Sequence, residues 1–266
     1  MGSPLPTCLR FSNLVDVSTD RFWREQAGDR PDTDLGDAFH HLETQVGQGL
    51  QQMTAAVKPR LRGWLHAGTF PLAVTVGVLL IALSPDAGSR WALALYTLSA
   101  GLLFGVSAVY HRGRWSQRTQ QMLRRWDHAN IFLIIAGTYT PFCVLVLPPA
   151  QARTLLWIVW SGALAGVAFR ILWIDAPRWL HVAVYIALGW VAVIYLPTFW
   201  QSGGTPVVTF LFLGGLLYTL GAVVYGIRRP DPNPRWFGFH EIFHALTIAA
   251  FTAHCIGIAL ALRTTP

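Results

Sequence analysis

Residues 206–227 read PVVTFLFLGGLLYTLGAVVYGI, a stretch of 22 residues without a charged side chain. A helix needs about 20 apolar residues to cross the ~30 Å hydrocarbon core of a bilayer, so this stretch predicts a transmembrane helix. Six more apolar runs have about this length, at residues 66–84, 91–110, 127–147, 154–174, 180–200 and 239–262. We therefore predict an all-α membrane protein that folds as a seven-transmembrane helix bundle.

The composition of the 266-residue chain agrees with a membrane location. It is 53% hydrophobic and 12% charged, with a mean hydropathy of +0.42. Soluble domains carry about 25% charged residues, so the composition argues against a cytosolic enzyme. The net charge of +7 raises nucleic acid as a partner. We exclude nucleic acid, because a basic balance inside an apolar chain is better explained by orientation in a membrane.

The basic residues alternate between the loops that join the seven predicted helices. Thirteen fall on one side: Lys58, Arg60, Arg62, Arg112, Arg114, Arg118, Arg124, Arg125, Arg170, Arg178, Arg228, Arg229 and Arg235. The other side holds three: Arg90, Arg153 and Arg263. The positive-inside rule then predicts a plasma-membrane protein with a cytoplasmic N-terminus and an outward C-terminus.

Residues 1–57 differ from the rest of the chain. They carry four Arg against eight acidic residues, whereas residues 58–266 carry sixteen basic against five acidic residues. We interpret 1–57 as an acidic cytoplasmic segment and 58–266 as the transmembrane domain. Apolar residues at spacings of three and four predict an amphipathic helix over about 35–57 that lies on the inner membrane surface or against the bundle. A regulatory or oligomerisation helix is the alternative.

Five polar residues are predicted to lie at one depth near the cytoplasmic side. His111 ends the second predicted helix, Asp127 begins the third and His240 begins the seventh. Ser107 and His244 lie four residues deeper, which is about 6 Å along a helix. Because an ionisable side chain in lipid is costly, these residues form a candidate functional site.

The spacing within the helices favours a metal. His240 and His244 are four residues apart and share one helix face, as two ligands of one ion do. With His111 they give three imidazoles and an open position, the pattern of a catalytic zinc site. Asp127 would then deprotonate the water at that position, and Ser107 would orient the water or a substrate carbonyl. The alternatives are an ion pair of Asp127 with Arg124 or Arg125, and a bond from Ser107 to its own helix.

The remaining histidines have simpler interpretations. His66 starts the first predicted helix and is interpreted as an interfacial polar cap, with a place beside the site as the alternative. His128 and His181 lie at helix ends, where a polar tip in the headgroup region needs no special role. His254, ten residues beyond His244, is interpreted as a hydrogen-bonded packing residue.

Residues 240–244 also read HEIFH, which matches the HExxH motif of zinc proteases with Glu241 as general base. The extended form of that motif places a third histidine where this chain has Ala250. The third ligand is better supplied by His111, and Glu241 then points about 100° away from the histidine face. A membrane metalloprotease is therefore the less favoured interpretation.

Three motifs in this order resemble those of the hemolysin III proteins. Ser107-Ala108-Val109-Tyr110-His111 resembles their SxxYH motif, Asp127-His128 with Gly137-Thr138-Tyr139-Thr140-Pro141-Phe142 is similar to their DH and GTYTPF segments, and His240–His244 resembles their last-helix HxxxH. These proteins belong to the progestin and adipoQ receptor (PAQR) group, which includes the adiponectin receptors and is more distantly related to alkaline ceramidases. The resemblance covers about residues 58–266 and leaves 1–57 without a counterpart.

The resemblance implies a seven-helix bundle in which His111, His240 and His244 hold Zn²⁺, with Asp127 and Ser107 beside the zinc-bound water. It also implies a zinc-dependent hydrolase of membrane lipid amides, ceramide-like in the related proteins, or a regulator of membrane and lipid homeostasis. The alternatives are a non-enzymatic zinc-stabilised membrane sensor and a cytolysin-like protein. The lipid partner and the oligomeric state are left open.

Overall fold

The computed structural model describes residues 42–46, 61–173, 176–233 and 235–264. The chain divides into two units, Met1–Ala56 and Val57–Pro266. In the first unit, residues 42–46 are helical, within the amphipathic helix predicted at 35–57. The rest of that helix and the acidic residues before it lie outside the described residues.

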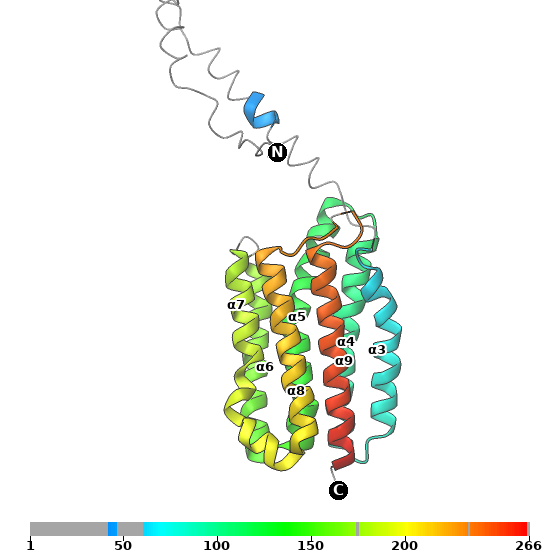
Figure 1. Cartoon of the computed structure of the whole chain (residues 1–266), viewed down its shortest axis with the longest axis vertical. Coiled ribbons are helices and arrows are strands. Elements are labelled where there is room, and N and C mark those ends of the chain that lie inside the picture. Colours follow the sequence, from blue (N-terminus) through cyan, green and yellow to red (C-terminus); the bar gives the residue numbers. More distant parts are fainter. Residues whose placement is uncertain (1–41, 47–60, 174–175, 234, 265–266) are drawn as a thin grey trace, which may run out of the picture. The chain divides into compact units, whose positions relative to one another are not determined.

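The second unit is a bundle of long helices (Figure 1), and its described residues form no strand. α4, α5, α6 and α9 are each 24 to 30 residues long, and α3 has 19. Six segments are long and apolar enough to cross a membrane. The elements are α3 (Trp64–Ala82), α4 (Ala87–Arg112), α5 (Gln117–Val146), α6 (Pro149–Leu172), α7 (Arg178–Gly189), the 3₁₀ helix η1 (Val191–Tyr195), α8 (Leu196–Ile227) and α9 (Phe239–Thr264).

Two helix starts are fixed by side-chain caps. The Ser116 hydroxyl accepts a hydrogen bond from the Thr119 backbone N–H, so α5 begins at Gln117, ten residues before the predicted apolar run. The polar first turns of α5 therefore extend the helix beyond its apolar part. At the other end of the bundle, Asp86 caps α4 by accepting from the Ser89 backbone N–H at 3.0 Å. Hydrogen bonds from Ser89 hold the pKa of the Asp86 carboxyl below its usual value.

The chain between Arg178 and Ile227 is arranged differently from the two predicted runs, 180–200 and 206–227. Its 50 residues make up one of the six candidate spans. α7 ends at Gly189 and η1 precedes α8, so the regular helix stops inside the run predicted at 180–200. The regular helix is broken inside α8 at Gly204, whose φ of 73° and ψ of 173° are non-helical. Glycine suits this position because positive φ is costly for other residues. Figure 1 shows the chain reversing direction near the start of α8.

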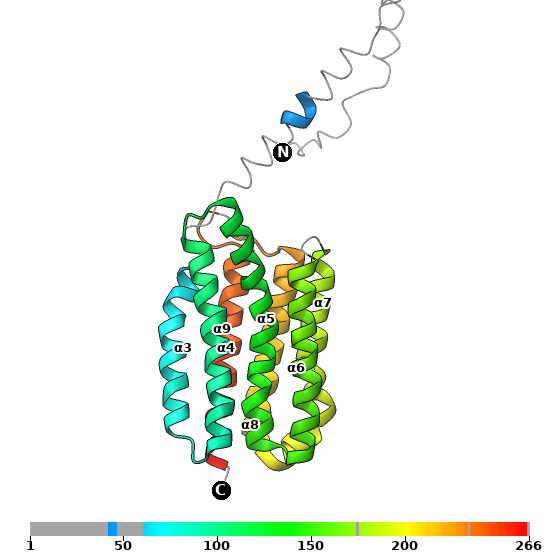
Figure 2. The same ribbon diagram turned by 180° about the vertical axis from the view of Figure 1, so that it is seen from behind.

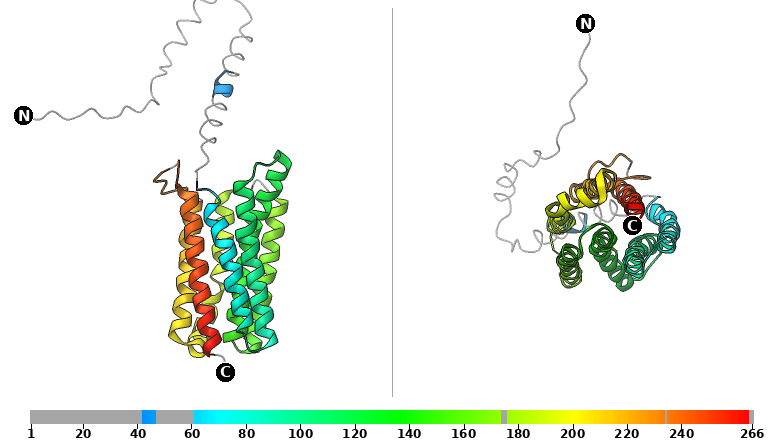
Figure 3. Two further views of the ribbon diagram at one scale, coloured as in Figure 1. Left: turned by 90° about the vertical axis from the view of Figure 1, so that its right-hand side faces the viewer. Right: turned by 90° about the horizontal axis from the view of Figure 1, so that it is seen from below.

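Neighbouring helices along the chain pack side by side, and α9 closes the bundle against α3. Figure 2 shows α4 and α5 next to each other, and the end-on view of Figure 3 shows the helices arranged in a ring. α5 is the most buried of the candidate spans and also contacts α7, α8 and α9. Large apolar side chains such as Leu72, Trp157 and Leu172 are exposed on the outside, where lipid rather than water suits them.

Candidate metal centre

His111, His240 and His244 come together at one end of the bundle. His111 lies in the last turn of α4, and the other two lie in the first turns of α9. His111 and His244 are buried, His240 is half-buried, and one nitrogen of each ring lies within 4.8 Å of the others. The structure thus brings together the three side chains that the sequence singled out, and their role as metal ligands stays a prediction.

The spacing of the three rings fits a metal ion. Two nitrogens bound to a tetrahedral zinc at about 2.0–2.1 Å are roughly 3.3–3.4 Å apart. The Nε2 atoms of His240 and His111 are 3.2 Å apart, which is close to that length. The ring centroids of His240 and His244 are 4.5 Å apart. A set of three imidazoles suits zinc, copper, iron and nickel, so the donor atoms fit a metal without selecting one.

Asp127 and Ser107 lie beside this cluster. The Asp127 Oδ2 atom is 3.7 Å from His111 Nε2, and its side chain is 12% exposed. Ser107, which is buried in α4, lines the same cavity end as Asp127. Among the described residues the ion-pair contact of Asp127 is with His111, not with Arg124 or Arg125. The ligand atoms of His111, His240 and His244 all lie within 4.8 Å of one another, and Asp127 is not part of this group. Asp127 is therefore a neighbour of the three histidines and not a fourth member of the cluster.

Glu241 has a structural environment. Its Oε2 atom accepts a hydrogen bond from the Gly238 backbone N–H at 2.9 Å, as in a capping box at the start of α9. Its Oε1 atom is 3.4 Å from Arg62 Nε, and the side chain is 1% exposed. Both oxygens thus have partners other than the three histidines, which agrees with the structural role predicted for Glu241 and argues against a general base.

His66 is not the interfacial cap that the sequence suggested. It is 2% exposed, and its ring stacks on His244 with centroids 3.8 Å apart and planes 5° apart. The edge of Phe104 closes another side of the ring. An apolar run in the sequence predicts how far along α3 His66 lies, but not which neighbour its side chain faces. The contact with His244 depends on how α3 is rotated about its axis relative to α9. His66 therefore supports the ring plane of His244.

The residues before α3 pack against the same cluster. Gly63 adopts a left-handed φ of 82°, and a Cβ atom there would lie 2.8 Å from the His111 Cβ. Arg112 stacks on the Trp64 ring, with its guanidinium carbon 3.8 Å from the centroid. Together with the Arg62–Glu241 pair, these contacts tie the start of α3 to α4 and α9.

We expect Gly63→Ala to weaken both folding and metal binding. The positive φ costs about 1–3 kcal/mol for a non-glycine residue, and the new methyl group would push against His111. Thermal unfolding in detergent, followed with and without added zinc, measures both effects. Gly68→Ala on α3 is the matched control, since nothing lies within 4 Å of its added methyl group. Equal behaviour of the two variants would contradict the proposed packing.

The other histidines among the described residues, His128, His181 and His254, form hydrogen bonds inside the bundle. His128 Nδ1 lies 2.7 Å from the Arg124 carbonyl oxygen, and because that oxygen can only accept, Nδ1 carries the proton and donates. In the neutral ring Nε2 then accepts a hydrogen bond from the Tyr225 hydroxyl at 2.9 Å. This bond joins α5 to α8, a structural role that the sequence did not predict. His181 is buried and bonds the Ala176 carbonyl. His254 donates from Nε2 to the Leu211 carbonyl, as expected of a packing residue.

An apolar cavity leads from the cluster into the bundle. It has a volume of about 140 Å³ and lies between α5, α7, α8 and α9. His240, His244, Asp127 and Ser107 line it at one end. Further along, its walls are apolar and aromatic side chains, among them Ile135, Phe142, Trp190, Phe199 and Phe212.

Helices of membrane-spanning length, apolar outer surfaces and a buried histidine cluster define a multi-pass membrane protein with a candidate metal centre. The family model described as "Haemolysin-III related" matches residues 54–255, about three quarters of the chain. The protein therefore belongs to the haemolysin III family.

Named relatives agree with this assignment. The chain is 35% identical over 172 residues to "Hemolysin-3 homolog" of Bacillus subtilis (strain 168), covering 63% of this chain and 80% of the relative. It is 27% identical over 203 residues to "Hemolysin-3" of Bacillus cereus, covering 75% and 90%. It is also 25% identical over 199 residues to "Monocyte to macrophage differentiation factor" of Homo sapiens, covering 73% and 80%.

Proposed function

We propose that this protein is a zinc-dependent hydrolase of membrane lipid amides. The observation that carries the proposal is the cluster of three histidine nitrogens within 4.8 Å, with the Asp127 carboxylate 3.7 Å from His111. The cluster opens onto an apolar cavity suited to an acyl chain. His111, His240 and His244 are the proposed zinc ligands.

The residues around the cluster would have different roles in amide hydrolysis. Zinc held there supplies Lewis-acid chemistry, which makes a water molecule more acidic and polarises a carbonyl group. Asp127 would accept the proton of the attacking water and return it to the leaving amine. Ser107, which lines the cavity beside Asp127, would orient the attacking water or the substrate carbonyl. His66 would hold the His244 ring in its plane by stacking.

We also propose that the chain crosses the membrane seven times. A straight helix of the length of Arg178–Ile227, 50 residues, would extend about 75 Å, more than twice the hydrocarbon thickness of ~30 Å. The break at Gly204 therefore supports two crossings within this segment. With α3, α4, α5, α6 and α9, the total is seven.

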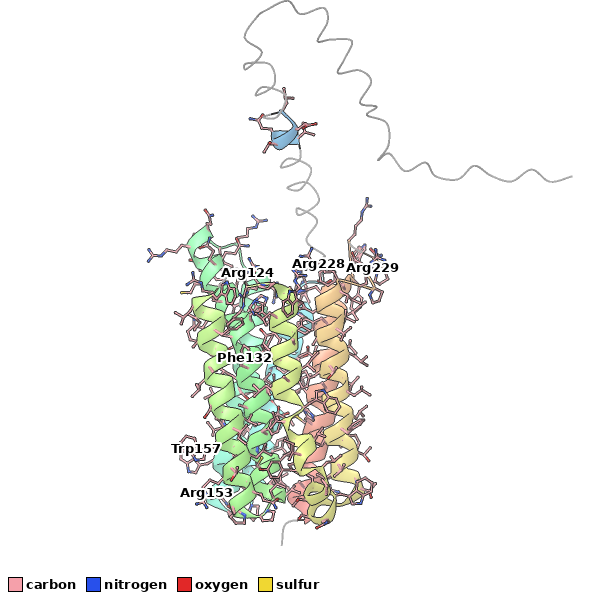
Figure 4. The ribbon with its side chains drawn as sticks, turned by 90° about the vertical axis from the view of Figure 1, so that its left-hand side faces the viewer. Arg124, Phe132, Arg153, Trp157, Arg228 and Arg229 are labelled. Carbon is pink, nitrogen blue, oxygen red and sulfur yellow. The ribbon has the colours of Figure 1, made fainter. Side chains whose placement is uncertain are left out.

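The proposed orientation places the metal centre on the cytoplasmic side of the plasma membrane. Arg124, Arg228 and Arg229 gather at one end of the bundle and Arg153 at the other (Figure 4), which supports the alternation of basic loops that the sequence predicted. A reporter enzyme that is active only outside the cytoplasm, fused after residue 266, should be active. The same reporter inserted between Arg229 and Arg235 should be silent, and the opposite pattern would reverse the orientation.

The function is tested with purified, zinc-loaded protein in detergent and a ceramide as substrate, followed by the release of free fatty acid. We expect release that stops when a chelator removes zinc and returns when zinc is restored. Protein that holds zinc but leaves ceramide and other amide lipids intact at high enzyme concentration would overturn the proposal.

A zinc-stabilised sensor without catalytic activity is the rival function. The 3.7 Å separation of Asp127 and His111 is the observation that favours it, because a small shift would make Asp127 a fourth ligand and close the site. The position of Asp127 outside the three-histidine set supports the open, catalytic form.

A further inference from the structure

Three arginines lie at helix ends on the side of the bundle that holds the metal centre. Arg124 lies near the start of α5, Arg178 is the first residue of α7 and Arg228 follows the end of α8. Figure 4 labels Arg124 and Arg228 at the same end of the bundle. We refer to Arg124, Arg178 and Arg228 as the arginine rim.

Each rim residue lies about one helical turn beyond a residue that lines the cavity. Arg124 precedes His128 by four residues, Arg178 precedes Val182 by four, and Arg228 follows Tyr225 by three. Side chains three or four residues apart share a helix face. Arg124 and Arg178 therefore share a helix face with a residue that lines the cavity, and Arg228, the left-handed C-cap of α8, directly follows the helix that carries Tyr225.

The arginine rim lacks compensating negative charge in the part of the chain that the structure describes. The ion pairs there are Arg62–Glu241 and His111–Asp127, and neither includes a rim arginine. Arg124 and Arg228 are close enough to Arg178 to repel its charge. The Nη1 atom of Arg178 is buried and has no hydrogen-bond partner. Such a group calls for a bound partner, and an anion would satisfy it.

Tyr225 connects the arginine rim to the metal centre. The guanidinium carbon of Arg178 lies 5.0 Å from the centroid of the Tyr225 ring. The same ring is 6.2 Å from the His240 ring, and its hydroxyl bonds His128, the neighbour of Asp127. An anion held by Arg178 would therefore lie one aromatic side chain away from the proposed zinc ligands.

We propose that the arginine rim binds the anionic headgroup, a carboxylate or phosphate, of an amide lipid whose acyl chain lies in the cavity. The inference rests on the proposed function, since it names the substrate class of that same site. Positive charge at this end also follows from the positive-inside rule, so charge alone would not require a ligand. The proposal rests on the helical spacing between the rim arginines and the residues that line the cavity, and on the buried Arg178 Nη1 atom without a hydrogen-bond partner.

Two probes that differ only in charge test this inference: N-palmitoylglycine and its methyl ester. Their binding to the full-length, zinc-loaded protein in a neutral maltoside detergent is measured by calorimetry. We expect the acid to bind about tenfold or more tightly than the ester, the gain typical of charged hydrogen bonds. Arg178→Gln should abolish most of that preference, and Arg124→Gln, on another helix, should reduce it.

Matched arginine controls separate a site from bulk charge. Arg229→Gln, beside the rim, and Arg153→Gln, at the opposite end of the bundle, should both keep the preference for the acid. Equal binding of acid and ester to the wild type, or the same loss of preference in the control variants, would overturn the inference.

Two further measurements distinguish a lipid from a soluble anion as the ligand, and binding from cleavage. N-acetylglycine, which has the carboxylate but no long chain, should not bind where N-palmitoylglycine saturates the protein; equal affinity would identify a site for soluble anions and overturn the lipid assignment. Release of palmitate is followed in the same samples. Preference for the acid without cleavage would support the arginine rim while counting against the proposed hydrolase.

Discussion

Asp127→Asn should lower the rate of amide hydrolysis by about 10²–10⁴-fold, the range for removal of a general acid–base group. The asparagine side chain has nearly the same shape, but it cannot accept the proton of the attacking water. Because Asp127 lies outside the three-histidine set, the zinc content of the variant should match that of the wild type. Fatty-acid release and zinc per chain are measured on the same preparation.

Asp86→Asn is the control for this variant. Asp86 lies at the opposite end of the bundle, where it caps α4, and asparagine caps a helix equally well. Its activity and zinc content should therefore be unchanged. Loss of zinc together with activity in Asp127→Asn would instead identify Asp127 as a direct ligand and favour the structural role of the metal.

The double variant His240→Ala, His244→Ala should lose zinc almost completely. It removes two of three ligands, so we expect a fall in affinity greater than the 10–100-fold cost of losing a group that only supports a ligand. Zinc per chain after detergent purification measures the effect. The wild type should hold about one zinc ion, because three histidines with an open position make one site.

Two single variants on α9 serve as controls. His254→Gln removes a histidine that bonds the Leu211 carbonyl, and it should keep its zinc. Glu241→Gln should keep both zinc and amide hydrolysis, because Glu241 accepts a hydrogen bond from Gly238 and pairs with Arg62 instead of serving as a ligand or base. Equal zinc in the wild type and the double variant would refute the assignment of these ligands.

The helices could largely be predicted from the sequence, because an apolar run of membrane length has few alternative structures. The differences from the prediction lie in polar helix ends and in short irregular segments. Ser116 caps α5, which begins ten residues before its apolar part. η1 interrupts the run predicted at 180–200, and Gly204 breaks α8 between the two predicted runs. Local hydrogen bonds and glycine geometry decide such places, and hydropathy does not detect them.

The candidate site was also predictable in part. Residue depth along a helix follows from sequence, so the meeting of His111, His240 and His244 could be inferred. The stacking of His66 on His244 and the bond from Tyr225 to His128 could not. Both depend on how each helix is rotated about its axis, which packing between helices decides.

The most direct test of the central claim, that three histidines hold one zinc ion with a position left open, is X-ray absorption spectroscopy at the zinc edge of the purified protein. We predict zinc with only nitrogen and oxygen neighbours at about 2.0–2.1 Å and with the scattering pattern of three imidazoles. Sulfur neighbours at about 2.3 Å, or protein that binds no zinc when zinc is supplied, would contradict it.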